Sequence, residues 1–310
     1  MCSTRLSMLR KNPQATSRKD KLMPIRLLYN QSQRKLAVFQ LLYRFCENWW
    51  TCCAIYLLRK PIEITFRNGF KGSFDWASLY KIIYLLENKV VLKQISGDVF
   101  EIDIDELRLR APIKYVLEYT QHLDVLYDGN EDYQNKVLVD IGAYIGDTAL
   151  YFWTKGVSKI ICYEPLQEFF IWLNENIKLN GVNAQLYNLG ISDHCGTVDI
   201  TYPEIFGDRS FEIKIRKLNE ILKRHRPIDI IKFECEGCEE CILYLSDDEL
   251  RAVPVWIIEA HSSALLNSLI SKFTNAGYEC RKIVPRMPKK GWFVVHFVNT
   301  NDPLNSVQSN

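Results

Sequence analysis

Short apolar runs alternate with amphipathic segments along the second half of the chain. The runs with the length and composition of buried strands are residues 137–141, 159–163, 184–189, 228–235 and 255–260. Segments with helical periodicity are residues 147–154, 166–180, 218–223, 238–245 and 264–276, and residues 197–202 have the pattern of a hairpin. Residues 278–283 and 292–298 follow with only a turn between them, so these last two strands should pair antiparallel. This alternation predicts an α/β fold with a doubly wound, mostly parallel, seven-stranded sheet, covered by helices on both faces and ending in an antiparallel strand.

The pattern before residue 129 is different. Residues 36–58 are strongly apolar, with Arg44 and Glu47 as their only charges, and their polar residues recur at three- and four-residue spacing. This spacing predicts an amphipathic helix with one narrow polar stripe. Three roles are open for it: packing against this protein's own domain or a partner subunit, peripheral contact with a membrane surface, or spanning a membrane.

A small α+β appendage is expected after that helix. Residues 62–66 alternate as a strand, and Asn68-Gly69 is a hairpin signal leading into residues 71–74. A helix over 76–86 and two short strands within 90–104 follow. We therefore expect a basic, disordered tail at 1–35, the helix and appendage at 36–128, the main domain at 129–300 and a C-terminal tail at 301–310.

Charge and cysteine content limit the partners and the compartment. Of the 39 Lys and Arg residues, nine lie in residues 1–35 beside a single acid, Asp20, so the remainder of the chain is mildly acidic. That remainder has no general basic footprint for nucleic acid. Ten cysteines in 310 residues do not form a dense disulfide framework, which favours a cytoplasmic protein. The oligomeric state is open.

A glycine turn follows the first strand of the main domain. Gly142 and Gly146 would let the backbone turn tightly and approach a ligand, while Asp140 at the strand's end can accept hydrogen bonds. Glu164 follows the second strand, where an acid in a doubly wound fold binds the hydroxyls of a ribose. Ser192 and Asp193 follow the third strand, where the same crevice would meet an adenine ring. The sequence therefore predicts a nucleotide site at this edge of the sheet.

The fourth strand brings a lysine and several acids to the same edge. Strand alternation places Lys232 and Glu234 on one face and Phe233 and Cys235 on the other. Glu236 would lie in the turn that follows. Alone, these acids would also suit a solvated helix N-terminus, because the helix dipole favours negative charge there.

Four stretches together resemble the FkbM-type family of S-adenosylmethionine-dependent methyltransferases. They are residues 140–147, Tyr163-Glu164-Pro165, residues 231–239 and Ile258-Glu259-Ala260-His261. The resemblance covers residues 129–300. The glycine turn and Glu164 occur in many nucleotide-binding folds, whereas the Lys-to-Glu-Gly stretch is far more specific to this family. Tyr144 and Glu234 depart from the family pattern, which commonly has Asn and Asp there.

The resemblance implies a Rossmann-like class I methyltransferase fold that uses S-adenosyl-L-methionine and methylates a hydroxyl on a small molecule or glycan. The residues expected to bind the cofactor are Asp140, Gly142, Ala143, Tyr144, Gly146, Glu164, Ser192, Asp193 and Glu234. A hydroxyl acceptor must lose a proton, and a base with a pKa near neutrality does this best. His261 is the first choice for that base, followed by Glu236 and Lys232.

Three other interpretations remain open. A nicotinamide-dependent oxidoreductase would use a similar turn and acid, although the turn lacks the G-x-G-x-x-G spacing. A non-catalytic methyltransferase-like scaffold is suggested by Tyr144 and Glu234. Cys235, Cys238 and Cys241 have the spacing of a metal knuckle, but buried small hydrophobic residues explain them better, and no metal is expected.

Overall fold

The computed structural model describes residues 39–51, 60–87, 90–104, 107–117, 123–129, 131–287 and 290–300. The chain divides into two compact units, Met1–Ile83 and Tyr84–Asn310. The division lies within helix α4 (Trp76–Glu87). The two tails expected at 1–35 and 301–310 lie outside the described residues, and the domain boundary near residue 129 stays a prediction.

The first unit contains the predicted hairpin. Strands β1 (Ile62–Thr65) and β2 (Lys71–Phe74) pair antiparallel, and Gly69 in the turn has a φ of 90°. The rings of Phe66 and Phe70 stack with centroids 3.9 Å apart, and both side chains are buried. The aromatic residues that flank the turn therefore form the core of the hairpin.

The described part of the predicted amphipathic helix is not one helix. Residues 39–45 are helical, Cys46 forms a β-bridge with Phe66, and helix resumes at residues 49–51, where this described stretch ends. The Asn48 side chain accepts from Thr65 N and donates to Glu63 O, both at 3.0 Å. Backbone groups at the edge of β1 need hydrogen-bond partners, and Asn48 supplies them. The predicted helix is interrupted where Asn48 makes these bonds. Among the described residues, no helix is long and apolar enough to cross a membrane.

A three-stranded antiparallel sheet begins the second unit. Its strands are β3 (Val91–Ser96), β4 (Val99–Ile104) and β5 (Leu107–Pro112), followed by the short helices α5 (Ile113–Val116) and α6 (Leu123–Tyr127). The two predicted strands are confirmed, whereas β5 and both helices were not predicted. Leu107, Leu109 and Ala111 alternate with two arginines, which is the period of a half-buried strand, so the sequence held a signal for β5.

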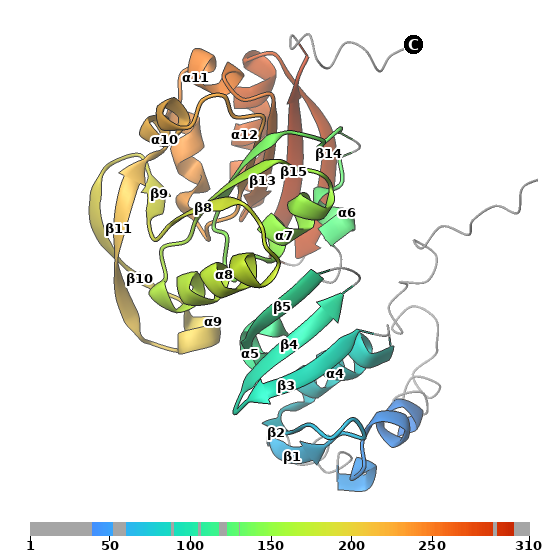
Figure 1. Cartoon of the computed structure of the whole chain (residues 1–310). Helices are drawn as coiled ribbons and strands as arrows, with labels where there is room; N and C mark the ends of the chain where they lie inside the picture. The colour runs from blue at the N-terminus through green and yellow to red at the C-terminus, as the bar shows by residue number, and fades with distance from the viewer. Residues whose placement is uncertain are drawn as a thin grey trace, which may run out of the picture. The chain divides into compact units, whose positions relative to one another are not determined.

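The main sheet of the second unit has seven strands in the order β14-β15-β13-β12-β6-β7-β8. Strands β13, β15 and β14 lie side by side in Figure 1. The bounds are β6 (Val137–Ile141), β7 (Lys159–Tyr163), β8 (Ala184–Tyr187), β12 (Ile230–Phe233), β13 (Val255–Ala260), β14 (Tyr278–Met287) and β15 (Trp292–Asn299). Strand β6 pairs in parallel with β7 and β12, and β15 is antiparallel to both of its neighbours. The mixed seven-stranded sheet and its antiparallel last strand are confirmed.

Helices cover the main sheet. The strand order reverses at β6, whose neighbours are β7 on one side and β12 on the other. The helices are α7 (Asp147–Thr154), α8 (Gln167–Leu179), α10 (Leu218–Arg224), α11 (Asp247–Arg251), α12 (Ser263–Asn275) and the 3-10 helix η2 (Cys238–Tyr244). One face of the sheet buries a continuous apolar cluster with α10, α11, α12 and η2. A reversal of strand order opens a crevice at the carboxyl ends of parallel strands, so ligands are expected beside β6.

A smaller sheet replaces the hairpin predicted at 197–202. Strand β10 (Gly196–Thr201) pairs with β11 (Ser210–Lys217), which also pairs with β9 (Gly190–Ser192), and helix α9 (Pro203–Phe206) joins β10 to β11. The observed hairpin therefore extends well beyond the predicted residues 197–202. Its two strands are joined by a loop in which Pro203 begins a short helix. The helix predicted at 238–245 is also different in type, being a 3-10 helix.

Candidate functional site

The glycine turn after β6 packs directly against the end of β12. Gly142 has a φ of 75°, and a Cβ atom there would lie 1.6 Å from the backbone oxygen of Glu234. The N–H groups of Gly142 and Ala143 both donate to Tyr163 O, at 2.9 and 3.1 Å. Gly146, with a φ of 94°, begins helix α7. Position 142 therefore requires glycine for both its conformation and its space.

Glu164 is connected to the turn through its carboxylate. Its two oxygens accept from Tyr144 N at 2.9 Å and from Leu166 N at 2.8 Å. Burial, only partly offset by these hydrogen bonds, raises the pKa of Glu164 to about 8. Tyr144 has a φ of 51°, and its ring packs edge-on against Phe169 with centroids 4.5 Å apart. The turn and the acid predicted separately thus form one connected unit.

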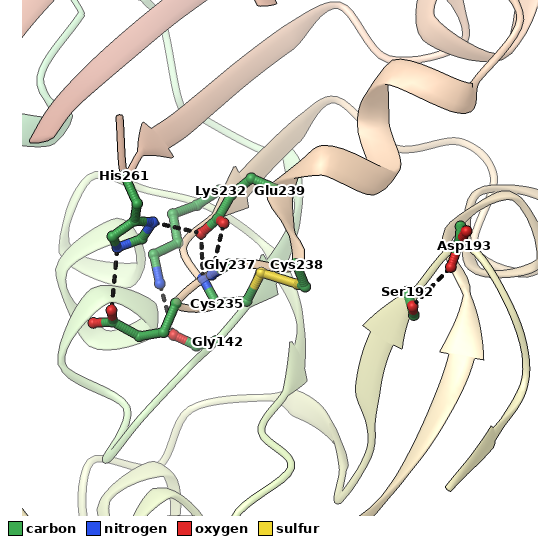
Figure 2. Close-up of a disulfide and its surroundings, with 10 residues drawn as sticks. Gly142, Ser192, Asp193, Lys232, Cys235, Gly237, Cys238, Glu239 and His261 are labelled. Carbon is green, nitrogen blue, oxygen red and sulfur yellow. Dashed lines mark hydrogen bonds and ion pairs between the residues drawn. A yellow bond between two sulfur atoms is a disulfide. The ribbon is translucent and has the colours of Figure 1, made fainter. Parts of the chain in front are cut away.

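A buried ion pair lies under the turn, between β6 and β12. Lys232 Nζ is 3.1 Å from Asp140 Oδ1 and donates to Gly142 O at 2.7 Å (Figure 2). Thr148 Oγ1 donates to the other oxygen of Asp140 at 2.6 Å. Burial alone would lower the pKa of Lys232, but Asp140, Glu234 and Asp147 outweigh it and raise the pKa above its usual value. Lys232 is therefore a fixed cation and cannot serve as a base at neutral pH.

Glu234 lies at the centre of a second buried network. Its carboxylate accepts from Tyr127 Oη at 2.6 Å, lies 3.6 Å from Lys232 Nζ, and pairs with Arg286, which also pairs with Glu259. Burial opposes ionisation of Glu234, but Arg286 and Lys232 hold the pKa of this carboxyl well below its usual value. Burial and the neighbouring Glu234 raise the pKa of Glu259 to about 9. Of the two carboxyl groups, Glu234 therefore carries the charge at neutral pH.

His261 follows β13 and lies among carboxylates. Its Nδ1 is 3.1 Å from Glu239 Oε1, and its Nε2 is 3.3 Å from Glu236 Oε2 and 3.9 Å from Glu259 Oε1. Figure 2 shows His261 and Glu239 pointing toward each other. Burial lowers the pKa of His261, but the adjacent carboxylates of Glu236 and Glu239 outweigh it and raise the pKa to about 10. The imidazole is therefore a cation at neutral pH in this arrangement.

The turn between β12 and η2 is closed by a disulfide that the sequence analysis did not predict. Cys235 and Cys238 are bonded, with Cα atoms 5.5 Å apart (Figure 2). The interpretation of both as buried small hydrophobic residues is therefore wrong, since the turn brings their side chains together. Cys241 is a buried free thiol. Within the described part of the chain, no group of three or more His, Cys, Asp or Glu residues suits a metal ion.

Comparison with known proteins connects these residues to a family. Residues 140–280 match the family model described as the methyltransferase FkbM domain. We call this matched region, residues 140–280, the FkbM domain. The predicted resemblance is therefore confirmed, and the matched region contains Asp140, Glu164, Lys232 and His261. Comparison with curated proteins gave no match.

The chain is also similar to solved structures, all distantly. A methyltransferase FkbM from Methylobacillus flagellatus is 17% identical, with a TM-score of 0.44, over 72% of this chain and 55% of that one. The TYW2 protein of M. jannaschii, solved in complex with AdoMet, is 14% identical, with a TM-score of 0.42, over 67% of this chain and 91% of that one.

Ser192 and Asp193 lie apart from the other predicted residues of the FkbM domain. Both are at the end of β9, and their side chains point toward each other and away from His261 and Lys232 (Figure 2). Asp193 Oδ1 is 2.7 Å from His194 Nδ1 and 3.1 Å from Ser192 Oγ. The structure therefore brings the turn, Glu164, Lys232, Glu234 and His261 to one edge but leaves this pair outside their hydrogen-bond network.

Several residues that contact the site were not predicted as site residues. They are Tyr127, Asp147, Glu239, Glu259 and Arg286. Glu239 and Glu259 belong to the stretches that carry the resemblance, so the sequence held a signal for them. Arg286 is on β14 and Tyr127 on α6, and nothing in the spacing connects either with residue 234. Only the fold brings these two side chains to Glu234.

Proposed function

We propose that this protein is an S-adenosylmethionine-dependent methyltransferase that methylates a hydroxyl group of a small molecule or glycan. The observation that carries this proposal is the connected set of Gly142, Glu164 and Lys232 at the carboxyl ends of three adjacent strands, within an FkbM domain. In a doubly wound sheet this edge is where a nucleotide binds.

The donor set fits the parts of S-adenosylmethionine. Glu164 has two oxygens fixed by backbone N–H groups, and its remaining lone pairs can accept hydrogen bonds from the ribose hydroxyls. The ionised Glu234 suits the ammonium of the amino-acid end, and Arg286 beside it suits the carboxylate. Ser192 and Asp193 remain our proposal for the adenine end. Bound S-adenosylmethionine would supply a methyl group already activated by the positive charge of its sulfonium.

The residues of this chain would mainly position the two reactants and remove a proton. Asp140 and Lys232 hold the turn through Gly142 O, which fixes the backbone beside the cofactor. The exposed Glu236 and the partly buried His261 face each other at the same edge. We assign proton removal from the acceptor hydroxyl to His261 in its neutral form, and Glu236 beside it influences how readily the imidazole gives up its own proton.

The acceptor can be found by incubating the full chain with methyl-labelled S-adenosylmethionine and metabolite or glycan fractions, followed by mass spectrometry. We expect a labelled product in which an oxygen carries the new methyl group. The Glu164→Gln variant should form the same product at a lower yield, because an amide accepts weaker hydrogen bonds from the ribose than a carboxylate. A folded chain that binds S-adenosylmethionine but methylates no hydroxyl in any fraction would contradict the proposed acceptor class.

A further inference from the structure

The Cys235–Cys238 disulfide closes the turn that carries two of the carboxylates facing His261. Glu236 lies inside the ring that the disulfide closes, and Glu239 follows immediately after it. Glu236 and Gly237 have φ values of 57° and 122°, so two successive residues of the ring occupy the left-handed region. Glutamate rarely adopts this conformation, and it persists only where the surroundings enforce it.

Glu239 contacts both the disulfide-closed turn and His261. This carboxylate is fully buried, and it accepts from Cys235 N at 2.9 Å and from Gly237 N at 2.8 Å. One of the same oxygens is 3.1 Å from His261 Nδ1. Both ring nitrogens of His261 are therefore paired with carboxylates whose positions depend on the closed turn.

The disulfide is placed where a reductant can reach it. Cys235 and Cys238 are half-buried, and the two residues between them, Glu236 and Gly237, are exposed. The next cysteine along the chain, Cys241, is different, because burial raises the pKa of its thiol and keeps it unreactive. A thiolate arriving from solvent would therefore meet the disulfide before it meets Cys241.

We propose that Cys235 and Cys238 form a reversible thiol–disulfide site, and that its reduction by a dithiol increases the fraction of His261 that is neutral and can accept a proton. This inference rests on the proposed function, in which neutral His261 accepts the proton of the acceptor hydroxyl. Opening the ring lets Glu236 leave its left-handed conformation and separate from His261 Nε2. With one carboxylate fewer beside it, His261 loses its own proton more readily, and each unit by which its pKa falls raises the neutral fraction about tenfold.

The redox step is a two-electron exchange between a dithiol and the disulfide. A thiolate of the dithiol attacks one sulfur of the Cys235–Cys238 bond, which forms a mixed disulfide and releases the other cysteine as a thiolate. The second thiol of the reductant then displaces the first cysteine. The reductant leaves as a disulfide, and Cys235 and Cys238 gain the two electrons and, on protonation, two S–H groups.

The test uses the full chain, oxidised or treated with dithiothreitol. Alkylation and peptide mapping show which cysteines have become thiols, and NMR of labelled imidazoles follows the titration of His261, assigned with a His261→Gln variant. We expect alkylation of Cys235 and Cys238 after reduction and a fall of about one unit or more in the pKa of His261. The Cys235→Ser/Cys238→Ser double variant should titrate like the reduced chain under both conditions.

The matched control is Cys195→Ser, which removes an exposed cysteine outside the turn and should respond like the unmodified chain. An unchanged His261 titration after Cys235 and Cys238 have been alkylated would overturn the inference. Resistance of the disulfide to a dithiol that leaves the fold intact would overturn it as well. Titration with S-adenosylmethionine in both states tests the proposed function separately, since that binding does not require His261 to change its protonation.

Discussion

Gly142 is the residue on which the site depends most directly. Its φ is positive, and a Cβ atom at this position would lie only 1.6 Å from Glu234 O, which leaves no room for another side chain. We predict that Gly142→Ala lowers the free energy of unfolding by more than about 3 kcal/mol, because backbone rather than a flexible side chain must move. Urea denaturation measures this loss.

Gly181→Ala is the matched control for that variant. Gly181 also has a positive φ, of 64°, but nothing lies within 4 Å of its Cβ position. The variant should therefore lower the free energy of unfolding by only about 1 kcal/mol, the cost of placing alanine in a left-handed conformation. Equal losses for the two variants would mean that the contact with Glu234 does not matter.

Glu164 should release a proton when the cofactor binds. Burial raises the pKa of Glu164 to about 8 in the free chain, so the carboxyl is mostly protonated below that pH. Hydrogen bonds from ribose hydroxyls favour the ionised form and lower the pKa, so binding releases a proton below about pH 8 and none well above it. Calorimetry in buffers of different ionisation enthalpy measures the release, and Glu164→Gln should abolish it. A release that persists in this variant would assign the proton to another group.

The roles of single residues could be predicted where the residues lie at the carboxyl end of a strand in the main sheet. Asp140, Glu164 and Lys232 follow from strand alternation and from the glycine turn, and the structure joins them through Gly142 and Tyr144. The protonation state of His261 was not predictable, because its carboxylate partners come from the next turn. The disulfide was missed for a related reason: strand and helix patterns separate Cys235 from Cys238, whereas the left-handed turn between them brings the two together.

At the scale of elements, helix α8 joins the glycine turn to strand β5. Asn176 on α8 is fully buried, and its amide donates to Arg110 O and Ile145 O, both at 2.9 Å. Its oxygen accepts from Arg110 N at 2.7 Å. One side chain therefore satisfies backbone groups of both β5 and the turn after β6.

We predict that Asn176→Ala lowers the free energy of unfolding by about 3 kcal/mol, because it leaves buried backbone groups of Arg110 and Ile145 without partners. Asn180→Ala is the matched control. Asn180 makes similar bonds to Arg108 at an exposed position, so water can replace it at a cost below about 1 kcal/mol. Urea denaturation compares the two, and equal losses would contradict the assigned role of Asn176.

The elements that hydrophobic periodicity predicted best are those of the main sheet, whose central strands β6, β12 and β13 are buried on both faces. Strand β6 and helix α7 have the predicted bounds. The prediction of one helix at 36–58 was wrong because Cys46 pairs with Phe66 and Asn48 bonds to β1. These tertiary contacts override the helical periodicity. Strand β5 was not predicted, although its apolar residues alternate with two arginines and Leu109 and Ala111 are buried, as in a half-buried strand.

At the scale of the whole molecule, the strand order places the site where β6 has β12 on one side and β7 on the other. The glycine turn comes from β6, Glu164 from β7, and Lys232 with Glu234 from β12. Strand β13 adds His261, and β14 adds Arg286. The arrangement draws on five of the seven strands, which explains why residues separated by more than a hundred positions form one network.

The most direct test of this account is calorimetric titration of the full chain with S-adenosylmethionine and, separately, with NADH. We predict saturable binding of S-adenosylmethionine and none of NADH, because the turn has the spacing of Gly142 and Gly146 rather than G-x-G-x-x-G. Lys232→Met should weaken the binding strongly, since it leaves Asp140 buried without its counter-ion. A folded chain that gives no heat with S-adenosylmethionine, or that binds NADH in its place, would contradict the central claim.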